Sequence, residues 1–135
     1  MNKKISWGLL NTLLLASPFI AANASEKDNI VCATVDVIAC VNDTACVKDT
    51  AKSFDLPEFI VVDKQKKLIR AAYESGHKGT SSIKTMEQQG DHLILQGVEN
   101  NRGWSVSIDT KKGDMSGSLV GEGLSFLVFG NCTAL

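Results

Sequence analysis

The sequence predicts an all-β domain in which about eight short antiparallel strands form a meander that closes into a small barrel or sandwich, held by disulfides. Three observations predict this class. Apolar and polar residues alternate through several segments, turn-forming residues recur about every eight to twelve positions, and the chain has four cysteines, all of them after residue 30. No internal repeat or low-complexity tract interrupts the pattern.

The strand segments follow one another with short connections, which favours antiparallel pairing of neighbours. Residues 30–39 are rich in valine and isoleucine, and the Asn-Asp pair in residues 40–46 favours a turn. Residues 47–54 fit either a short helix or an irregular strand, and Pro57 ends them. Further strands are expected at residues 58–62, 68–73, 83–88, 114–120 and 124–129. The last of these, LSFLVF, is the most apolar, and we expect it to be central or buried.

The clearest architecture lies in residues 91–109, DHLILQGVENNRGWSVSID, which predict two strands of a hairpin. In the second strand, Trp104, Val106 and Ile108 alternate with polar residues, so they share one face. The Asn and Gly residues within 99–103 tolerate the positive φ angles that tight hairpins need. We therefore predict a hairpin whose Trp104 face belongs to the core.

Residues 1–24 predict a cleaved secretory signal peptide that is not part of the fold. A short basic head precedes the apolar residues 5–20, and Ala22-Asn23-Ala24 is a small-x-small cleavage site. Pro18 and this cleavage site argue against an uncleaved anchor. We therefore expect one domain, residues 25–135, exported to a bacterial periplasm or secreted, with no membrane span after cleavage.

The charge balance argues against a nucleic-acid partner. The full chain has a formal charge of −1, and cleavage of the signal peptide would remove Lys3 and Lys4 and make it more acidic. No basic patch is present to neutralise phosphates. We expect a monomer without a cofactor, whose partner is a protein or a small ligand.

All four cysteines lie in the predicted mature chain, an even number that predicts two disulfides in an exported domain. Four cysteines allow three pairings. We favour Cys40–Cys46, which closes a local loop, and Cys32–Cys132, which joins the first strand to the last. A zinc site is disfavoured because His77 and His92 are far in sequence from any cysteine pair and no CxxC occurs.

The chain resembles a family of small exported bacterial proteins of unassigned role. Its early cysteines, Leu56-Pro57-Glu58-Phe59, the block from Gln96 to Asp109 and the terminal FGNCT of residues 129–133 carry the resemblance, which covers nearly the whole mature chain. The resemblance implies export and a disulfide-bonded β domain. It brings no catalytic residues to this sequence.

Four residues are candidates for a binding site. Asp36 lies within the first strand, where strict alternation puts it on the face of Thr34 and opposite Val35; it is either solvent-facing or a partly buried carboxylate at a barrel mouth. In the second case Arg70 or Arg102 could pair with it, because arginine forms bidentate contacts with carboxylates. Arg102 and Trp104 are also the residue types enriched at binding hot spots.

The sequence contains no recognisable catalytic motif. A GxSxG elbow is absent, and His77 in a flexible segment and His92 at a strand start each lack an identifiable partner. The sequence therefore favours a non-enzymatic binding, inhibitor or accessory module. The alternative is a small exported hydrolase or isomerase that uses Asp36, His77 or His92, which would require these residues to meet in a concave pocket.

Overall fold

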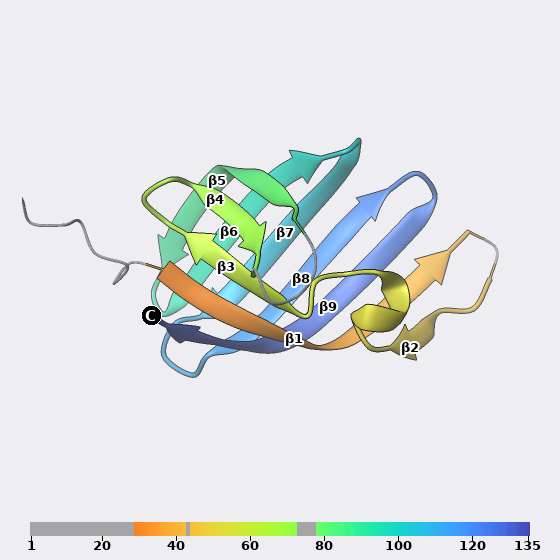
Figure 1. The fold of residues 1–135 in the computed structure, drawn as a ribbon, viewed down its shortest axis with the longest axis horizontal. Helices are drawn as coiled ribbons and strands as arrows, with labels where there is room; N and C mark the ends of the chain where they lie inside the picture. The colour runs from red at the N-terminus through yellow and green to blue at the C-terminus, as the bar shows by residue number, and fades with distance from the viewer. Residues whose placement is uncertain (1–28, 43, 73–77) are drawn as a thin grey trace, which may run out of the picture.

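A computed structural model describes residues 29–42, 44–72 and 78–135, and in them the chain is all-β (Figure 1). The strands are β1 (Asn29–Val41), β2 (Val47–Asp49), β3 (Phe59–Asp63), β4 (Leu68–Ala71), β5 (Thr80–Gln89), β6 (His92–Glu99), β7 (Arg102–Asp109), β8 (Asp114–Gly121) and β9 (Leu124–Ala134). The ambiguous residues 47–54 contain β2 and one turn of 3-10 helix, Lys52–Phe54. The predicted fold class is confirmed. The predicted signal peptide, residues 1–24, lies outside the described residues.

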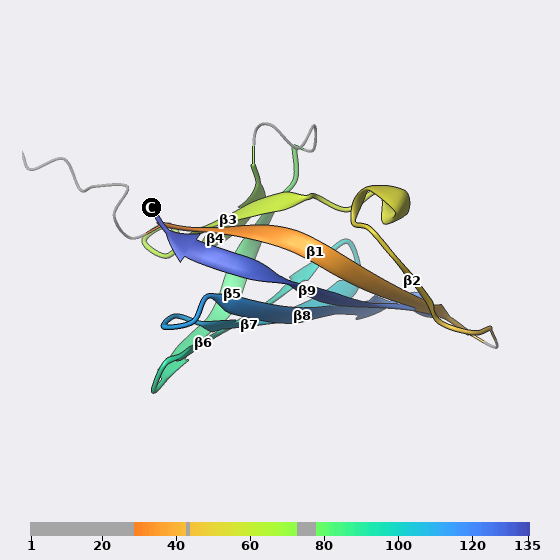
Figure 2. The same ribbon diagram turned by 90° about the horizontal axis from the view of Figure 1, so that it is seen from below.

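The strands form a closed antiparallel barrel of eight strands with β2 as an extra strand. Consecutive strands pair from β3 through β9, and β9 also pairs along almost the whole of β1. The first half of β1 also pairs with β3, whereas its second half pairs with β2. Figure 2 shows the consequence: β1, β3 and β4 lie on one side, and β6, β7 and β8 lie on the other.

The pairing of β1 with β9 contains a bulge between Thr34 and Asp36, and this bulge corrects the predicted face of Val35. Strict alternation grouped Val35 with Val37. In the structure Val37 is fully buried, whereas Val35 is 54% exposed. One extra residue in β1 exchanges the inner and outer faces beyond it.

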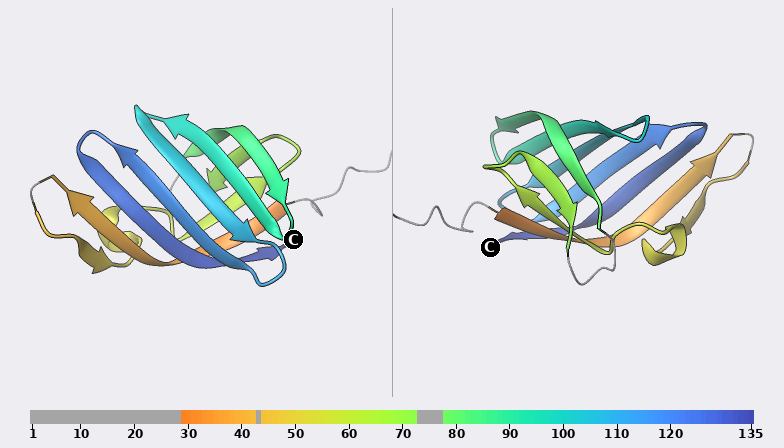
Figure 3. Two further views of the ribbon diagram at one scale, coloured as in Figure 1. Left: turned by 180° about the vertical axis from the view of Figure 1, so that it is seen from behind. Right: turned by 45° about the horizontal axis from the view of Figure 1, so that its top comes forward.

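The hairpin of residues 91–109 is confirmed as β6 and β7, which pair from His92 and Asp109 to Glu99 and Arg102. Figure 3 (left) shows these two long strands from behind. The turn is a two-residue turn in which Asn100 and Asn101 have φ angles of 48° and 62°. Both angles are positive, as a type I′ hairpin requires.

The strand expected at residues 124–129 to be central or buried is central in the sheet, but only one of its faces is buried. In β9 Phe126 is buried, but Leu127 and Phe129 are 44% and 42% exposed. The strand is paired on both sides, by β8 and β1, so its backbone is central. A barrel strand nevertheless has one face toward solvent, and an apolar run cannot tell which face that is.

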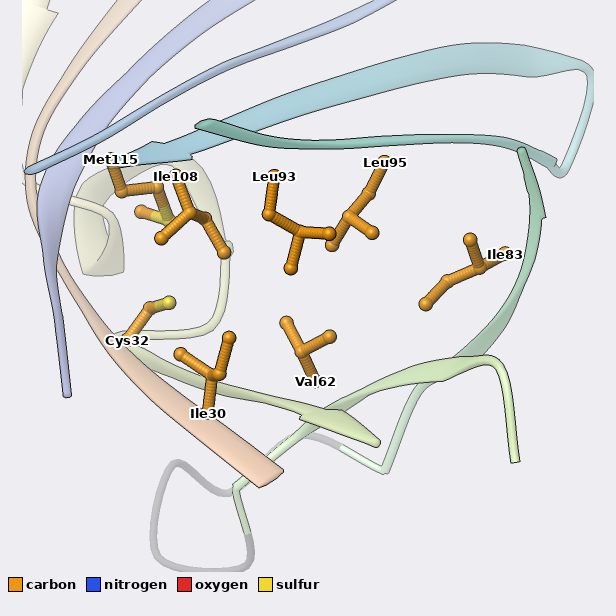
Figure 4. Packing of buried hydrophobic residues seen from close by; sticks show 8 residues of the cluster. All are labelled: Ile30, Cys32, Val62, Ile83, Leu93, Leu95, Ile108 and Met115. Carbon is orange, nitrogen blue, oxygen red and sulfur yellow. The ribbon is translucent and has the colours of Figure 1, made fainter. Parts of the chain in front are cut away.

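Two apolar clusters form the core. The larger cluster fills one half of the barrel with side chains from strands on opposite sides, which point toward one another in Figure 4: Ile30, Cys32, Val62, Ile83, Leu93, Leu95, Ile108 and Met115. The smaller cluster lies where β1 and β9 extend beyond β3. There the 3-10 turn covers them, and Phe54 packs on Phe126 with ring centroids 5.8 Å apart.

Both predicted disulfides are confirmed. Cys32–Cys132 has an S–S distance of 2.02 Å and joins β1 to β9, and Cys40–Cys46 has one of 2.05 Å and closes the loop before β2. All four cysteines are therefore disulfide-bonded. Within the described residues, no helix has the length and apolarity needed to cross a membrane.

Candidate functional site: an apolar well at one end of the barrel

The barrel is packed at one end but not at the other. Near the β6–β7 turn it contains a pocket of about 220 Å³, here called the apolar well. Its wall comes from eight strands, all but β2, and from the segment that precedes β3. The described lining residues are Thr34, Leu56, Pro57, Ile60, Ile69, Ser81, Glu99, Trp104, Val106, Met115, Gly117, Ser118, Leu119 and Val128.

Trp104 is held in the wall of the well by two contacts. Its indole Nε1 donates a hydrogen bond of 2.9 Å to Oγ of Ser81, a buried residue of β5. Its ring lies over Gly97, its cross-strand neighbour in β6, where a Cβ atom would collide with the ring. Half-buried Trp104 and Val106 therefore pack against the core and also border open space, whereas Ile108 is fully buried.

The well continues outward into a wider and more polar pocket of about 380 Å³, here called the mouth. The two pockets share seven lining residues, among them Leu56, Ile69 and Glu99. The mouth adds Arg70, Lys78 and Arg102, so it brings together the two arginines that the sequence singled out.

The arginines differ in what they contact. Nη2 of Arg102 lies 3.1 Å from Oε2 of Glu122 and forms an ion pair with it, while its Nε is buried without a hydrogen-bond partner among the described residues. Arg70 is exposed, and no partner is observed for it in the described part of the chain. The guanidinium of Arg102 is thus bound to Glu122 in the neighbouring β8–β9 turn.

Asp36 does not belong to the mouth, which corrects the hypothesis that it pairs with Arg70 or Arg102. Its carboxylate lies 2.9 Å from Nζ of Lys48 in β2. Asp36 lines a different depression, of about 550 Å³, on the outer face of the barrel. Of the two readings weighed for Asp36, the solvent-facing one describes its position.

His92 lines the same outer depression, but β7, β8 and β9 lie between its strand, β6, and the strand of Asp36, β1, so four inter-strand spacings separate them. With neighbouring strands about 4.8 Å apart, these two residues lie on the order of 19 Å from each other along the sheet. This distance is far beyond the reach of a shared catalytic hydrogen bond, about 3 Å. His77, the third candidate, lies outside the described residues.

The nearest ionisable neighbour of His92 has a structural role of its own. Asp109, which pairs with His92 across the hairpin, accepts hydrogen bonds from the backbone amides of Lys112 at 2.9 Å and Lys111 at 3.0 Å. The amide of Lys112 is the main cause that lowers the pKa of the Asp109 carboxyl below its ordinary value, and the charge of His92 adds to it. This carboxylate therefore stabilises the β7–β8 turn.

The inner well is a better candidate site than the larger outer depression. The outer depression is lined by a mixture of carboxylates, hydroxyls and single apolar groups, and two of its carboxylates are already bound, Asp36 by Lys48 and Asp109 by the amide of Lys112. The well is concave and mostly apolar with a few polar groups at its edge, which is the usual composition of a small-molecule site. Among the described residues, no group of three or more His, Cys, Asp or Glu side chains is placed to hold a metal ion.

The sequence pointed to Trp104 but missed most of the well. Ile69, Leu119 and Glu99 lie in three different strands and meet only through the strand order. The usable signal was the alternation of β7, which places Trp104 and Val106 on the inner face of the hairpin but does not show that open space lies beside them. Comparisons with family models, with curated proteins and with solved structures find no match to this chain.

Proposed function

We propose that this protein is an exported, non-enzymatic binding protein that holds a small, largely apolar ligand in the apolar well. The observation that carries the proposal is the well itself: an unfilled apolar pocket inside a barrel whose other half is packed. Protein interiors otherwise pack to the density of organic crystals, with few voids larger than a water molecule. An apolar pocket that also opens into the mouth is therefore suited to binding a small ligand.

Two disulfides support function outside the cytoplasm, because such bonds persist in oxidising compartments. Cys32–Cys132 also joins the two ends of the strand meander covalently, which supports a preformed binding site. The catalytic alternative lacks comparable support, since Asp36 and His92 do not meet.

The size of the well limits the ligand. A volume of about 220 Å³ is below the range of about 300–1,000 Å³ that is usual for drug-sized molecules. It corresponds to roughly seven water-sized groups at about 30 Å³ each, so it fits a chain of about eight carbons or a single ring system. At about 0.8 kcal/mol for each buried methylene group, an octyl chain gains roughly 6 kcal/mol, which places the expected Kd between about 1 μM and 1 mM.

The test is a titration of the mature protein with 1-octanol, a neutral probe. Trp104 is the one tryptophan of the predicted mature chain, and it lines the well, so its fluorescence should change on binding. Isothermal titration calorimetry should give a Kd in the range above. The absence of any saturable signal up to the solubility limit of the probe would overturn the proposal.

A matched pair of variants locates the binding. Val106→Phe adds bulk inside the well and should weaken octanol binding at least about tenfold, because the filled space excludes the chain. Val98→Phe adds the same bulk to the outer face of the same hairpin, where Val98 is 61% exposed, and should leave binding unchanged. Equal effects of the two substitutions would place the site elsewhere.

A further inference from the structure

Glu99 stands out among the residues that line the apolar well. It is the last residue of β6, directly before the hairpin turn, and it borders both the well and the mouth. Among the described lining residues of the well, it is the only one with an ionisable side chain. A half-buried carboxylate at the edge of an apolar space is costly unless a counter-charge or hydrogen-bond donors compensate for its lost hydration.

The expected counter-charge is bound elsewhere. Arg102 is the cross-strand partner of Glu99 in the β6–β7 register, and such opposite charges often pair. Its guanidinium instead contacts Glu122, 3.1 Å away. Within the described residues, the carboxylate of Glu99 has neither an ion pair nor a hydrogen bond.

Trp104 provides a second element beside this carboxylate. It lies two positions along β7 from the partner of Glu99, so the two residues are diagonal neighbours on the inner face of the hairpin. Its hydrogen bond to Ser81 fixes the indole in the wall of the well. An aromatic ring and a carboxylate at one site form the combination that attracts an organic cation, through the ring quadrupole and through direct charge pairing.

We propose that the ligand is an amine with an apolar body, whose ammonium group is bound by Glu99 beside Trp104 and whose apolar part fills the well. This inference rests on the proposed binding function and specifies the chemical class of the ligand. The opposite class is an acid bound by the cations of the mouth. It is disfavoured because all three cations border only the mouth: Arg70 and Lys78 are exposed, where solvent and salt screen their charge, and Arg102 is already paired with Glu122.

The test compares three probes with the same chain, octylammonium, 1-octanol and octanoate, by isothermal titration calorimetry at pH 7 and low salt. Octylammonium should bind the wild type about tenfold more tightly than octanol, and octanoate should bind most weakly, because one charge-assisted contact is gained in the first case and repulsion replaces it in the last. Glu99→Gln should remove the advantage of octylammonium, so that octylammonium and octanol bind this variant with similar affinity.

Glu87→Gln is the matched control, since it removes one carboxylate from an exposed position on β5 that does not line the well. It should preserve the order of the three probes. Tightest binding of octanoate, equal affinity for all three probes, or an unchanged preference in Glu99→Gln would overturn the ammonium assignment while octanol binding still supports the well. Failure of all three probes would instead overturn the binding function itself.

Discussion

At the residue scale, the position of Trp104 depends on a glycine. A Cβ atom on Gly97 would collide with the indole ring and would lie 2.6 Å from the carbonyl oxygen of Ser82. Glycine in a strand interior normally costs about 0.5–1 kcal/mol relative to alanine. The close packing of the ring on the bare backbone explains why glycine occupies this position all the same.

We predict that Gly97→Ala lowers the free energy of unfolding by about 1–3 kcal/mol, the usual cost of overpacking. The added methyl group must displace the ring of Trp104 or the backbone of β5. Urea denaturation followed by circular dichroism measures this change, and the fluorescence of Trp104 should shift with it.

Gly103→Ala is the control for this prediction. It lies in β7 of the same hairpin, and a Cβ atom there would have no neighbour within 4 Å. We expect no loss of stability, or a small gain from the reduced freedom of the unfolded chain. Equal losses in both variants would contradict the packing argument.

Local chemistry made some single residues predictable and left others open. The asparagines of the β6–β7 turn and the glycine of the 110–113 turn, Gly113, adopt positive φ, as their residue types suggest. The face of Val35 was not predictable, because nothing in the sequence marks the bulge that moves it outward.

At the scale of elements, the two disulfides differ in the strands they join. Cys32 and Cys132 are paired residues of β1 and β9 with a sequence separation of 100, and Cys32 is fully buried in the core. Cys40 and Cys46 are separated by six positions and close a loop outside the main core. The first bridge therefore restricts the unfolded chain far more than the second does.

We predict that the double substitution Cys32→Ala with Cys132→Ala destabilises the barrel more than Cys40→Ala with Cys46→Ala. The chain-entropy relation gives about 4.7 kcal/mol for a loop of about 100 residues and about 2.4 kcal/mol for one of about seven. Urea unfolding of the two variants measures the difference. A larger loss in the short-loop variant would show that strand closure does not depend on the long bridge.

At the scale of the whole molecule, every strand of the described residues lies after the predicted signal peptide. The first strand begins at Asn29, after the expected cleavage site between Ala24 and Ser25. Removal of residues 1–24 therefore leaves every strand of the barrel intact, and both disulfides remain in the mature chain.

We predict that the protein expressed in a bacterium with an outer membrane is recovered from the periplasm with Ser25 as its first residue. Intact-mass spectrometry and N-terminal sequencing measure this outcome. Ala24→Arg should block cleavage, because the peptidase site accepts small residues. Recovery of the wild-type chain with Met1 retained would contradict the prediction of a signal peptide.

The sequence by itself determined the elements of this protein and their covalent ties. Alternation, turn residues and cysteine spacing act over short stretches, so the hairpin of residues 91–109, most of the strands and the two disulfide pairings were predicted correctly. The tertiary structure alone decided between a closed barrel and a sandwich, exchanged the faces of β1 at Thr34 and placed Asp36 on the outer face beside Lys48. It also decided the well, because Ile69, Glu99 and Leu119 are brought together by strand order and register, which depend on contacts between distant parts of the chain.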